Sequence, residues 1–362
     1  MNILYINNSM HLGGDNKCIL KLCKELKDEN KIVVASKGGI LTQDFEDMGI
    51  SHYFIKDVVN KRPHIIIFNI MKLIKIVKDE NIDVIHSHHR MATLTAKIVS
   101  RFVKVRVIHT QHLCIEDKFK LTKLALNNIQ TITVSNAAKR ILETKSNLED
   151  KNITTIYNTI EVKNENKVVD ERLKQLKESG YYIVCQVSRV IDYKGVYDFV
   201  DIAEVTVKEN DNIRFVFIGD GPEKEKLQKY IKEKKLEKYV YMLGSKNNVI
   251  EHLKYIDLVL LCSYIEGLPL APLEAFSQGI PVIATNIDGT NEEIKDDYNG
   301  FLVNIKDIDA FKTNILKVFN DKSLQKKLKE NATKTYYDNF NEVIYKSRHQ
   351  DIYNSQTKKW KD

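Results

Sequence analysis

The sequence lacks the features that mark membrane-spanning, secreted and disulfide-stabilised proteins. No segment approaches the run of about 18 apolar residues that a membrane-spanning helix needs. Residues 1–6 form an apolar run with no basic region before it, which argues against a secretory signal peptide. The 5 cysteines are odd in number, have no CxxC spacing and fall in apolar contexts. We therefore expect reduced, buried thiols and a cytoplasmic protein.

Strong charge is also missing. The net charge of +7, with a pI near 8.8, is too small to indicate a nucleic-acid partner. It fits an enzyme that handles phosphates or approaches an anionic membrane surface. The chain does have length and apolar content, with 362 residues of which 43% are hydrophobic. These values favour two domains, each with a sizeable core.

The most informative stretch is residues 257–284, which reads as a strand, a loop, a short helix and a second strand. Pro272 fits the first position of the helix and Gly279 fits its end. This predicts Glu266 on the loop and Glu274 in the first helical turn. A carboxylate accepts hydrogen bonds from neighbouring sugar hydroxyls, and free N–H groups at a helix start bind phosphate. The pattern favours recognition of a polyol beside an anion, with solvated glutamates as the plain alternative.

The flanking residues carry a family resemblance. Glu-Gly-Leu-Pro at 266–269, seven residues between the two carboxylates, Glu-Ala at 274–275 and Gly-x-Pro-Val at 279–282 are similar to the donor-site signature of retaining GT-B glycosyltransferases. The pattern resembles glycosyltransferase family 4 in particular. The resemblance covers most of the chain, is densest over residues 188–303, and is looser in the first half.

The resemblance implies an α/β fold of GT-B architecture, with two Rossmann-like domains facing each other across a cleft. We expect an acceptor-side domain at residues 1–165 and a nucleotide-sugar donor domain at residues 166–335. Residues 336–362 would form a C-terminal helix that crosses back to the first domain, followed by a basic tail.

Two cations bracket a loop after the strand expected to begin at residue 181. Arg189 suits a diphosphate by its planar fork and Lys194 as a point charge, although solvated side chains are the plain alternative. The resemblance implies that both residues neutralise the diphosphate, that Glu266 binds the sugar hydroxyls and that Glu274 binds the ribose. Ser188 stands where the family usually has glycine.

A Gly-x-Gly at 219–221 raises the alternative of a nicotinamide-dinucleotide site. The third glycine of that fingerprint is absent, and the segment is not the first strand-to-helix turn of the chain. Gly-Asp-Gly-Pro at 219–222 instead resembles the glycosyltransferase pattern. The resemblance implies these donor-binding residues: Gly14, Gly219, Gly221, Gly244, Gly267, Leu268, Leu270 and Glu274.

Histidines gather at the ends of two expected strands, at 86–89 and 109–112. Open α/β sheets bind ligands at this edge, so substrate contact competes with plain packing and with a metal site. No carboxylate or thiol lies at ligand spacing, which weakens the metal alternative. The resemblance favours His112, in a Thr-x-His pattern, as a catalytic residue facing the transferred sugar, with His88 and His109 as weaker acceptor-side matches. No metal or other cofactor is expected, because two cations and helix N-termini can neutralise the phosphates.

The implied activity is transfer of a hexose or N-acetylhexosamine from a nucleoside-diphosphate sugar, expected to be a UDP-sugar, with retention of configuration. The acceptor would be a hydroxyl of a saccharide, lipid-linked or protein substrate in cell-surface polysaccharide or glycoconjugate synthesis. Two alternatives remain open: a sugar-nucleotide epimerase or hydrolase on the same fold, and a non-catalytic nucleotide-sugar-binding subunit.

Two segments suggest peripheral contact with the inner face of a membrane. The helix expected over residues 65–78 carries lysines beside its apolar positions, and the tail places Trp360 among three lysines. A helix packed on the sheet and a solvated tail are the plain alternatives.

Overall fold

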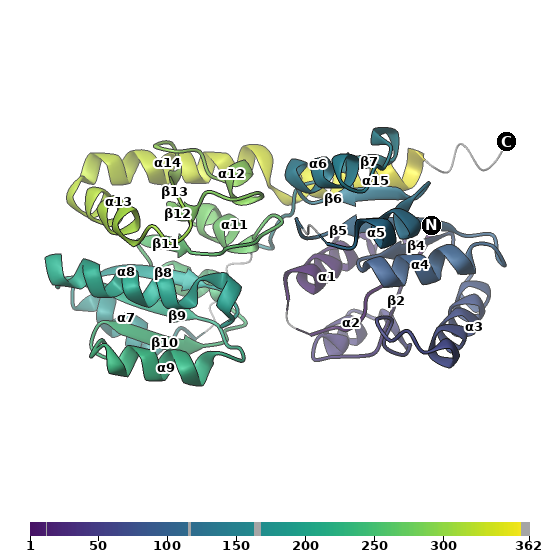
Figure 1. Cartoon of the computed structure of the whole chain (residues 1–362), viewed down its shortest axis with the longest axis horizontal. Helices are drawn as coiled ribbons and strands as arrows, with labels where there is room; N and C mark the ends of the chain where they lie inside the picture. Colours follow the sequence, from purple (N-terminus) through teal and green to yellow (C-terminus); the bar gives the residue numbers. More distant parts are fainter. Residues whose placement is uncertain (12, 115–116, 163–167, 356–362) are drawn as a thin grey trace. The chain divides into compact units, whose positions relative to one another are not determined.

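The computed structural model describes residues 1–11, 13–114, 117–162 and 168–355, and the chain folds as two compact units. Unit 1 comprises Met1–Asn158 and Glu342–Asp362, and unit 2 comprises Thr159–Asn341 (Figure 1). The basic tail around Trp360 lies outside the described residues.

The unit boundaries differ by a few residues from the expected ones at 165/166 and 335/336. The second shift has a physical cause, because helix α14 (Lys322–Asn339) packs against α11 (Leu270–Ser277) within unit 2. Tyr336 of α14 is 1% exposed, and its hydroxyl donates to the carbonyl of Ile160 at 3.3 Å. The chain therefore returns to unit 1 with the next helix, α15 (Glu342–Ser355), and not at residue 336.

Unit 1 is a parallel α/β sheet with strand order β3-β2-β1-β4-β5-β6-β7 among its described residues. Its elements are β1 (Asn2–Ile6), α1 (Gly14–Leu26), β2 (Lys31–Ser36), α2 (Thr42–Asp47), β3 (Ser51–Phe54), α3 (Pro63–Asp79), β4 (Val84–Ser87), α4 (Arg90–Val99), β5 (Arg106–Gln111), α5 (Phe119–Leu126), β6 (Gln130–Thr133), α6 (Asn136–Thr144), the short 3-10 helix η1 (Asp150–Asn152), β7 (Ile153–Thr155) and α15.

The two faces of this sheet alternate along each strand, as side chains in a strand must. On β1, Ile3 and Tyr5 pack with α1, α2 and α15, whereas Leu4 and Ile6 pack with α3 and α4. Both faces are covered, so the central strands read as continuous apolar runs, which is why the sequence predicts them well. The sequence does not predict the edge strand β3, because its residues are exposed or only half-buried and form no apolar run.

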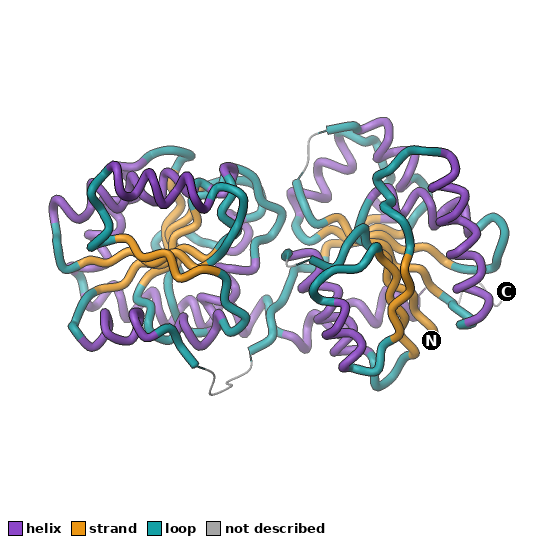
Figure 2. The backbone as a smooth tube through the Cα atoms, turned by 90° about the horizontal axis from the view of Figure 1, so that it is seen from below, coloured by secondary structure: helices purple, strands orange, loops and turns teal. Residues whose placement is uncertain are grey.

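Unit 2 repeats the architecture with strand order β10-β9-β8-β11-β12-β13, again parallel. Its elements are α7 (Glu171–Glu178), β8 (Tyr182–Val187), the short 3-10 helix η2 (Asp192–Lys194), α8 (Val196–Glu209), β9 (Ile213–Ile218), α9 (Lys224–Glu233), β10 (Val240–Gly244), α10 (Val249–Leu253), β11 (Leu258–Leu261), α11, β12 (Val282–Thr285), α12 (Thr290–Glu293), β13 (Gly300–Val303), α13 (Ile308–Asn320) and α14. Figure 2 shows the strands of each unit, in orange, between layers of helices.

Helix α11 corrects one expectation. It begins at Leu270, two residues before Pro272, so Pro272 is its third residue and Glu274 its fifth. Proline is tolerated there because the first four N–H groups of a helix have no partner within the helix. The helix ends as expected: Gly279 adopts a φ of 67°, and Ile280 N donates to the carbonyl of Ala275 at 2.9 Å. Glu274 therefore lies in the second turn and not in the first.

The order of the strands predicts where a ligand would bind. In unit 1 the chain reverses its direction of travel across the sheet between β1 and β4, and in unit 2 between β8 and β11. Loops leave such neighbouring strands in opposite directions, which opens a crevice at their carboxyl ends. The Gly13-Gly14 loop and His88 follow β1 and β4, whereas Arg189 and Glu266 follow β8 and β11.

None of the 5 cysteines, all of which are described, forms a disulfide; Cys114 is half-buried and the other four are buried, so the expectation of buried thiols fails only at Cys114. No helix within the described residues is long and apolar enough to cross a bilayer.

Candidate functional site

In unit 2 the switch point brings three of the expected residues onto adjacent loops. Lys194 Nζ donates to Glu266 Oε1 at 2.6 Å, and the two side chains are 17% and 4% exposed. The buried Gln186 holds this loop, because its Nε2 donates to the Lys194 carbonyl at 2.8 Å. Arg189 is exposed and has no ion-pair partner among the described residues. The loop therefore presents one unpaired cation and one cation already neutralised by a carboxylate.

Three glycines let the neighbouring backbones pack closely enough to form this edge. Gly195 has a φ of 63°, and a Cβ there would lie 2.0 Å from the carbonyl oxygen of Cys262. A Cβ on Gly219 would lie 1.8 Å from the carbonyl oxygen of Ser188, and one on Gly221 would lie 2.4 Å from that of Val190. Gly219 and Gly221 thus press the loop after β9 against the loop that carries Arg189.

The start of α11 forms the other wall of the site. Its N-cap residue, Pro269, makes no side-chain capping hydrogen bond. Gly267 lies against Gly289, where a Cβ would be 2.4 Å from the Gly267 carbonyl oxygen, whereas Leu268 is 4% exposed. Glu274 is 7% exposed on the same helix. A buried carboxylate near free helix N–H groups provides both acceptors for hydroxyls and donors for phosphate oxygens. The expected Gly244 lies at the end of β10, where its carbonyl oxygen accepts from Gly219 N of the neighbouring loop at 3.0 Å.

Sequence reasoning missed one acidic residue here. Glu293, at the end of α12, is 1% exposed, and neither carboxyl oxygen has a hydrogen-bond partner among the described residues. Burial, together with the charges of Glu266 and Glu292, raises the pKa of Glu293 well above its usual value. Burial therefore favours the uncharged form of this carboxyl group. The adjacent Glu292 gives this segment the appearance of a solvated helix, so the sequence carries no signal of burial.

In unit 1 the loop after β1 is organised around Asn7. Its Nδ2 donates to Asp15 Oδ2 at 2.9 Å and to Asn16 Oδ1 at 2.7 Å, which ties the strand end to the start of α1. Gly14 is the first residue of α1 and is exposed, and nothing lies within 4 Å of a Cβ built there. The loop thus leaves Gly14 open at the carboxyl edge of the sheet.

Two of the histidines are core residues. His86 is fully buried; its Nδ1 lies 2.7 Å from the Tyr353 hydroxyl and its Nε2 lies 2.8 Å from Thr110 Oγ1. His109 is 1% exposed, with Nδ1 2.7 Å from Thr93 Oγ1 and Nε2 3.3 Å from Gln111 Oε1. Both ring nitrogens of each are occupied. His109 therefore lacks a free nitrogen for an acceptor, and its expected acceptor-side role does not fit this placement.

His88 and His112 form a pair at the edge itself. His88 Nδ1 lies 2.8 Å from His112 Nε2, and the rings are inclined by only 24°. His88 is 6% exposed, and its Nε2 has no partner among the described residues. His112 is half-buried, so the sequence-predicted His112 reaches the surface whereas His88 supports it from behind.

Burial lowers the pKa values of the clustered histidines. The pKa of His88 lies well below 6.5, through burial first and then through its histidine neighbours, and burial lowers that of His112 as well. The pKa of His109 falls to about 3. The cluster is therefore neutral at physiological pH. Within the described ranges, no group of three or more His, Cys, Asp or Glu side chains is arranged to hold a metal ion.

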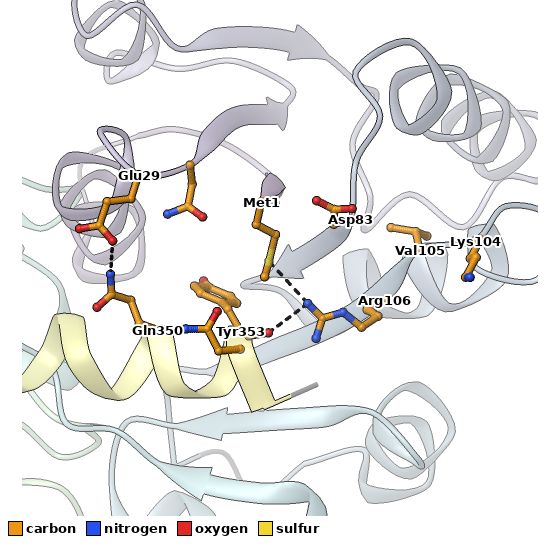
Figure 3. Close-up of a pocket in the computed structure, with 10 residues that line it drawn as sticks. Met1, Glu29, Asp83, Lys104, Val105, Arg106, Gln350 and Tyr353 are labelled. Carbon is orange, nitrogen blue, oxygen red and sulfur yellow. Dashed lines mark hydrogen bonds between the residues drawn. The ribbon is translucent and has the colours of Figure 1, made fainter. Parts of the chain in front are cut away.

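A cavity of about 680 Å³ lies elsewhere in unit 1 (Figure 3). Its lining includes Met1, Asp83 and Arg106, which lie at or just before the starts of β1, β4 and β5. This is the amino edge of the sheet, opposite the carboxyl edge that carries the histidines, and Asn354 also lines the cavity. We do not assign it to the site.

Solved structures define the class of fold. The protein is similar to Anabaena Alr3699/HepE in complex with UDP, with a TM-score of 0.85 and 19% identity, over 98% of this chain and 100% of that chain. It is also similar to sucrose-phosphate synthase (tll1590) from Thermosynechococcus elongatus, with a TM-score of 0.83 and 16% identity, over 98% and 99% of the two chains. The fold is that of the GT-B glycosyltransferases.

Sequence comparisons define the family. A family model described as "Glycosyltransferase Family 4" matches residues 12–164, and one described as "Glycosyl transferases group 1" matches residues 169–335. The chain belongs to glycosyltransferase family 4, and the protein is a glycosyltransferase.

Curated relatives share about a quarter of their residues with the chain. A UDP-Gal:alpha-D-GlcNAc-diphosphoundecaprenol alpha-1,3-galactosyltransferase of Escherichia coli is 27% identical over 343 residues, which is 89% of this chain and 88% of that protein. The capsular polysaccharide biosynthesis glycosyltransferase CapH of Staphylococcus aureus is 28% identical over 311 residues, 81% and 83% of the two chains. An N,N'-diacetylbacillosaminyl-diphospho-undecaprenol alpha-1,3-N-acetylgalactosaminyltransferase of Campylobacter jejuni is 25% identical over 362 residues, 92% and 93% of the two.

Proposed function

We propose that the protein transfers a hexose or N-acetylhexosamine from a UDP-sugar to a hydroxyl of a lipid-linked saccharide, with retention of configuration. The observation that carries this proposal is the placement of Arg189, the Lys194–Glu266 pair and Glu274 on the segments that follow β8 and β11, at the switch point of unit 2. That arrangement offers charge for a diphosphate and carboxylates for ribose and sugar hydroxyls on adjacent loops.

Each group has a distinct task in the transfer. Negative charge builds on the departing diphosphate as the bond to the sugar breaks, and Arg189 and Lys194 stabilise that charge from fixed positions. Glu274 accepts hydrogen bonds from the ribose, and Glu266 accepts from the sugar while it holds Lys194 in place. In unit 1, His112 contacts the sugar. No carboxylate is assigned as a nucleophile, so the leaving phosphate itself takes the proton of the incoming hydroxyl.

The donor and acceptor classes are supported by the relatives. The Escherichia coli protein is named for UDP-Gal, and the Anabaena structure contains UDP. The Escherichia coli and Campylobacter proteins are both named for diphosphoundecaprenol-linked acceptors. These names favour a uridine nucleotide and an acceptor anchored in a membrane.

Helix α3 offers a surface suited to such an acceptor. Its Leu73, Ile76 and Val77 pack on the sheet, whereas Ile67 and Met71 are 56% and 66% exposed. Basic side chains surround this apolar surface, which we call the α3 face; they are Lys61, Arg62, Lys72, Lys75 and Lys78. An exposed apolar stripe with basic neighbours suits the surface of an anionic bilayer. We propose that the α3 face holds the enzyme at the cytoplasmic surface of the membrane.

Incubation with a panel of nucleotide sugars tests the function. Purified protein would be given UDP-glucose, UDP-galactose, UDP-N-acetylglucosamine and GDP-mannose, each with and without a polyprenyl-diphosphate saccharide. We expect acceptor-dependent release of UDP and a product whose anomeric configuration, read by NMR, matches that of the donor. Isomerised donor without transfer would instead indicate an epimerase, and binding without turnover would indicate a carrier subunit.

Chelation tests the proposed absence of a metal. The protein cations are expected to meet the phosphate charge, so turnover should survive EDTA. Loss of turnover that a divalent ion restores would contradict this part of the proposal.

A further inference from the structure

The His88–His112 pair differs from His86 and His109 in one respect. His86 and His109 have a partner at both ring nitrogens, as buried polar groups usually do. His88 has a partner only at Nδ1, although it is 6% exposed and its Nε2 is enclosed. His112 is bonded only at Nε2, and its Nδ1 has no hydrogen-bond partner among the described residues. One enclosed nitrogen and one open nitrogen thus lie at the two ends of the pair.

Only two proton arrangements are available to this pair when both rings are neutral. A neutral imidazole has one N–H donor and one bare acceptor nitrogen. In the first arrangement His88 Nδ1–H donates to His112 Nε2, so the remaining proton of His112 is on Nδ1. In the second arrangement His112 Nε2–H donates to His88 Nδ1, so the remaining proton of His88 is on Nε2.

The enclosed Nε2 of His88 decides between them. The second arrangement buries an N–H there without an acceptor, which forfeits a hydrogen bond that this donor makes in water. The first arrangement leaves only a bare nitrogen at that position, and buried acceptors are left unsatisfied more often than buried N–H groups. The ring of His86 packs against that of His88, with the two centroids 4.5 Å apart. The first arrangement is therefore favoured.

We infer that His88 is a positioning residue that holds His112 in the tautomer protonated at Nδ1, so that His112 presents a hydrogen-bond donor and not a base to an oxygen of the bound sugar. The inference rests on the proposed function for the identity of the ligand. A histidine protonated at Nδ1 cannot act as a base through that nitrogen. The proton of the acceptor hydroxyl is therefore transferred to the donor phosphate and not to His112.

Nuclear magnetic resonance reads the tautomer directly. The full-length protein would be labelled with ¹⁵N-histidine, and long-range ¹H–¹⁵N correlations would be recorded at pH 7.5. Signals of His88 and His112 would be assigned from their loss in His88→Asn and His112→Asn proteins. We expect both rings to be protonated at Nδ1, the tautomer that free histidine disfavours. An Nε2-protonated or doubly protonated His112 would overturn the inference.

An isosteric pair of variants tests the consequence for turnover. In His88→Asn the side-chain amide can place an N–H where Nδ1–H was, whereas His88→Asp offers only an acceptor and forces the proton of His112 onto Nε2. We expect His88→Asn to keep kcat within about twofold, and His88→Asp to lower it by about 10-fold, the effect of one hydrogen bond. Equal activity of the two folded variants would overturn the role.

A third variant keeps the test valid if the buried charge of His88→Asp prevents that variant from folding. His88→Leu removes donor and acceptor alike without burying a charge, and we expect its His112 to revert to Nε2–H with a kcat between those of the Asn and Asp variants. His109→Asn is the matched control, because His109 is a core residue with both nitrogens bonded. It should lower the melting temperature while leaving kcat and the tautomer of His112 unchanged.

Failure of the proposed function is distinguishable from failure of this inference. UDP binding, measured by calorimetry, concerns unit 2 and should be equal in the wild type and all His88 variants. Absence of transfer by the wild type would count against the proposed function, whereas the NMR result decides the tautomer without any turnover.

Discussion

The two units present the same kind of sheet edge but fill it with different chemistry. In unit 1 the carboxyl edge is built from neutral histidines that hydrogen-bond to hydroxyls and to each other. In unit 2 the corresponding edge holds an ion pair, an unpaired arginine and two buried glutamates. Both edges lie where the strand order reverses.

This difference suits the two parts of a nucleotide sugar. A diphosphate carries charge, and fixed cations stabilise it most effectively in a site that excludes water. A transferred sugar is uncharged, and neutral donors can recognise its oxygens without the desolvation penalty of a buried ion. Under the proposed function, one fold would serve a charged ligand in unit 2 and an uncharged one in unit 1 by changing the residues at one edge.

The largest effect is expected from the cations of unit 2. Arg189→Ala and Lys194→Ala should each lower kcat by roughly 10²–10³, as loss of a preorganised charge-stabilising group does. Lys208→Ala is the control, since Lys208 is 65% exposed on α8 and forms a surface ion pair with Glu204. Initial rates, with circular dichroism to check folding, give the comparison. Near-normal turnover by either site variant would remove that residue from the diphosphate site.

The two carboxylates should separate nucleotide binding from sugar transfer. Glu274→Ala should weaken UDP binding by about 1.5–3 kcal/mol, the value of hydrogen bonds to a charged group, and raise KM for the donor. Glu266→Ala frees Lys194 from its ion pair, so it should bind UDP at least as tightly as the wild type while losing kcat. Calorimetry with UDP alone measures both. Equal weakening in the two variants would contradict this division.

The contribution of Lys194 and Glu266 should also be non-additive. Because the two side chains form one ion pair, the double variant should lose little more kcat than the worse single variant. A sum of the two single losses would show that they act independently.

The two units should respond in opposite directions to mild acid. The pKa of His109 is lowered to about 3 and that of His349 to about 4, against about 6.5 in an unfolded chain. The unfolded state therefore binds more protons than the folded state below about pH 6.5, and unit 1 loses stability as the pH falls. The pKa of Glu293 is raised, so the folded unit 2 holds that proton and its stability falls as the pH rises.

Hydrogen exchange, corrected for the intrinsic effect of pH, follows the two units separately. Between pH 7.5 and 5, β4 and β5 should lose protection whereas β11 and β12 should not. Glu293→Gln should raise the melting temperature more at pH 7.5 than at pH 5. A pH-independent effect of that substitution would show that Glu293 is not protonated in the folded state.

The smallest effect concerns the membrane. Met71→Asp should weaken sedimentation with anionic vesicles, because it places a negative charge on the α3 face, whereas Val343→Asp, on an exposed apolar residue of α15, should not. Each cation near the surface contributes only about 1 kcal/mol, so binding should be weak and salt-sensitive. Removal of the last five residues tests the tail around Trp360 in the same assay. Equal binding by all forms would dismiss both segments as anchors.

The sequence predicts the buried strands and the loops between them well, because a parallel strand covered on both faces reads as an apolar run. It misses β3, whose residues are exposed or half-buried, and it places the start of α11 two residues late because proline is tolerated anywhere in the first turn.

The sequence predicts which residues form the candidate site better than it predicts how their charges interact. Pattern and spacing indicate Arg189, Lys194, Glu266 and Glu274, but they cannot show that Lys194 and Glu266 neutralise each other. The burial of Glu293 and the pairing of His88 with His112 depend on packing between segments far apart in the chain. Such contacts leave no mark on local sequence.

The position of α15 at the end of the chain determines which unit can complete its fold first during translation. Tyr345 and Tyr353 complete a core cluster of unit 1, and the hydroxyl of Tyr353 lies 3.0 Å from that of Tyr5 and 2.7 Å from His86. During synthesis unit 2 is fully translated before these residues are added, so unit 2 can fold while unit 1 still lacks helix α15. A chain that ended at Asn341 would contain the whole of unit 2 but would lack the α15 residues that complete the histidine cluster of unit 1.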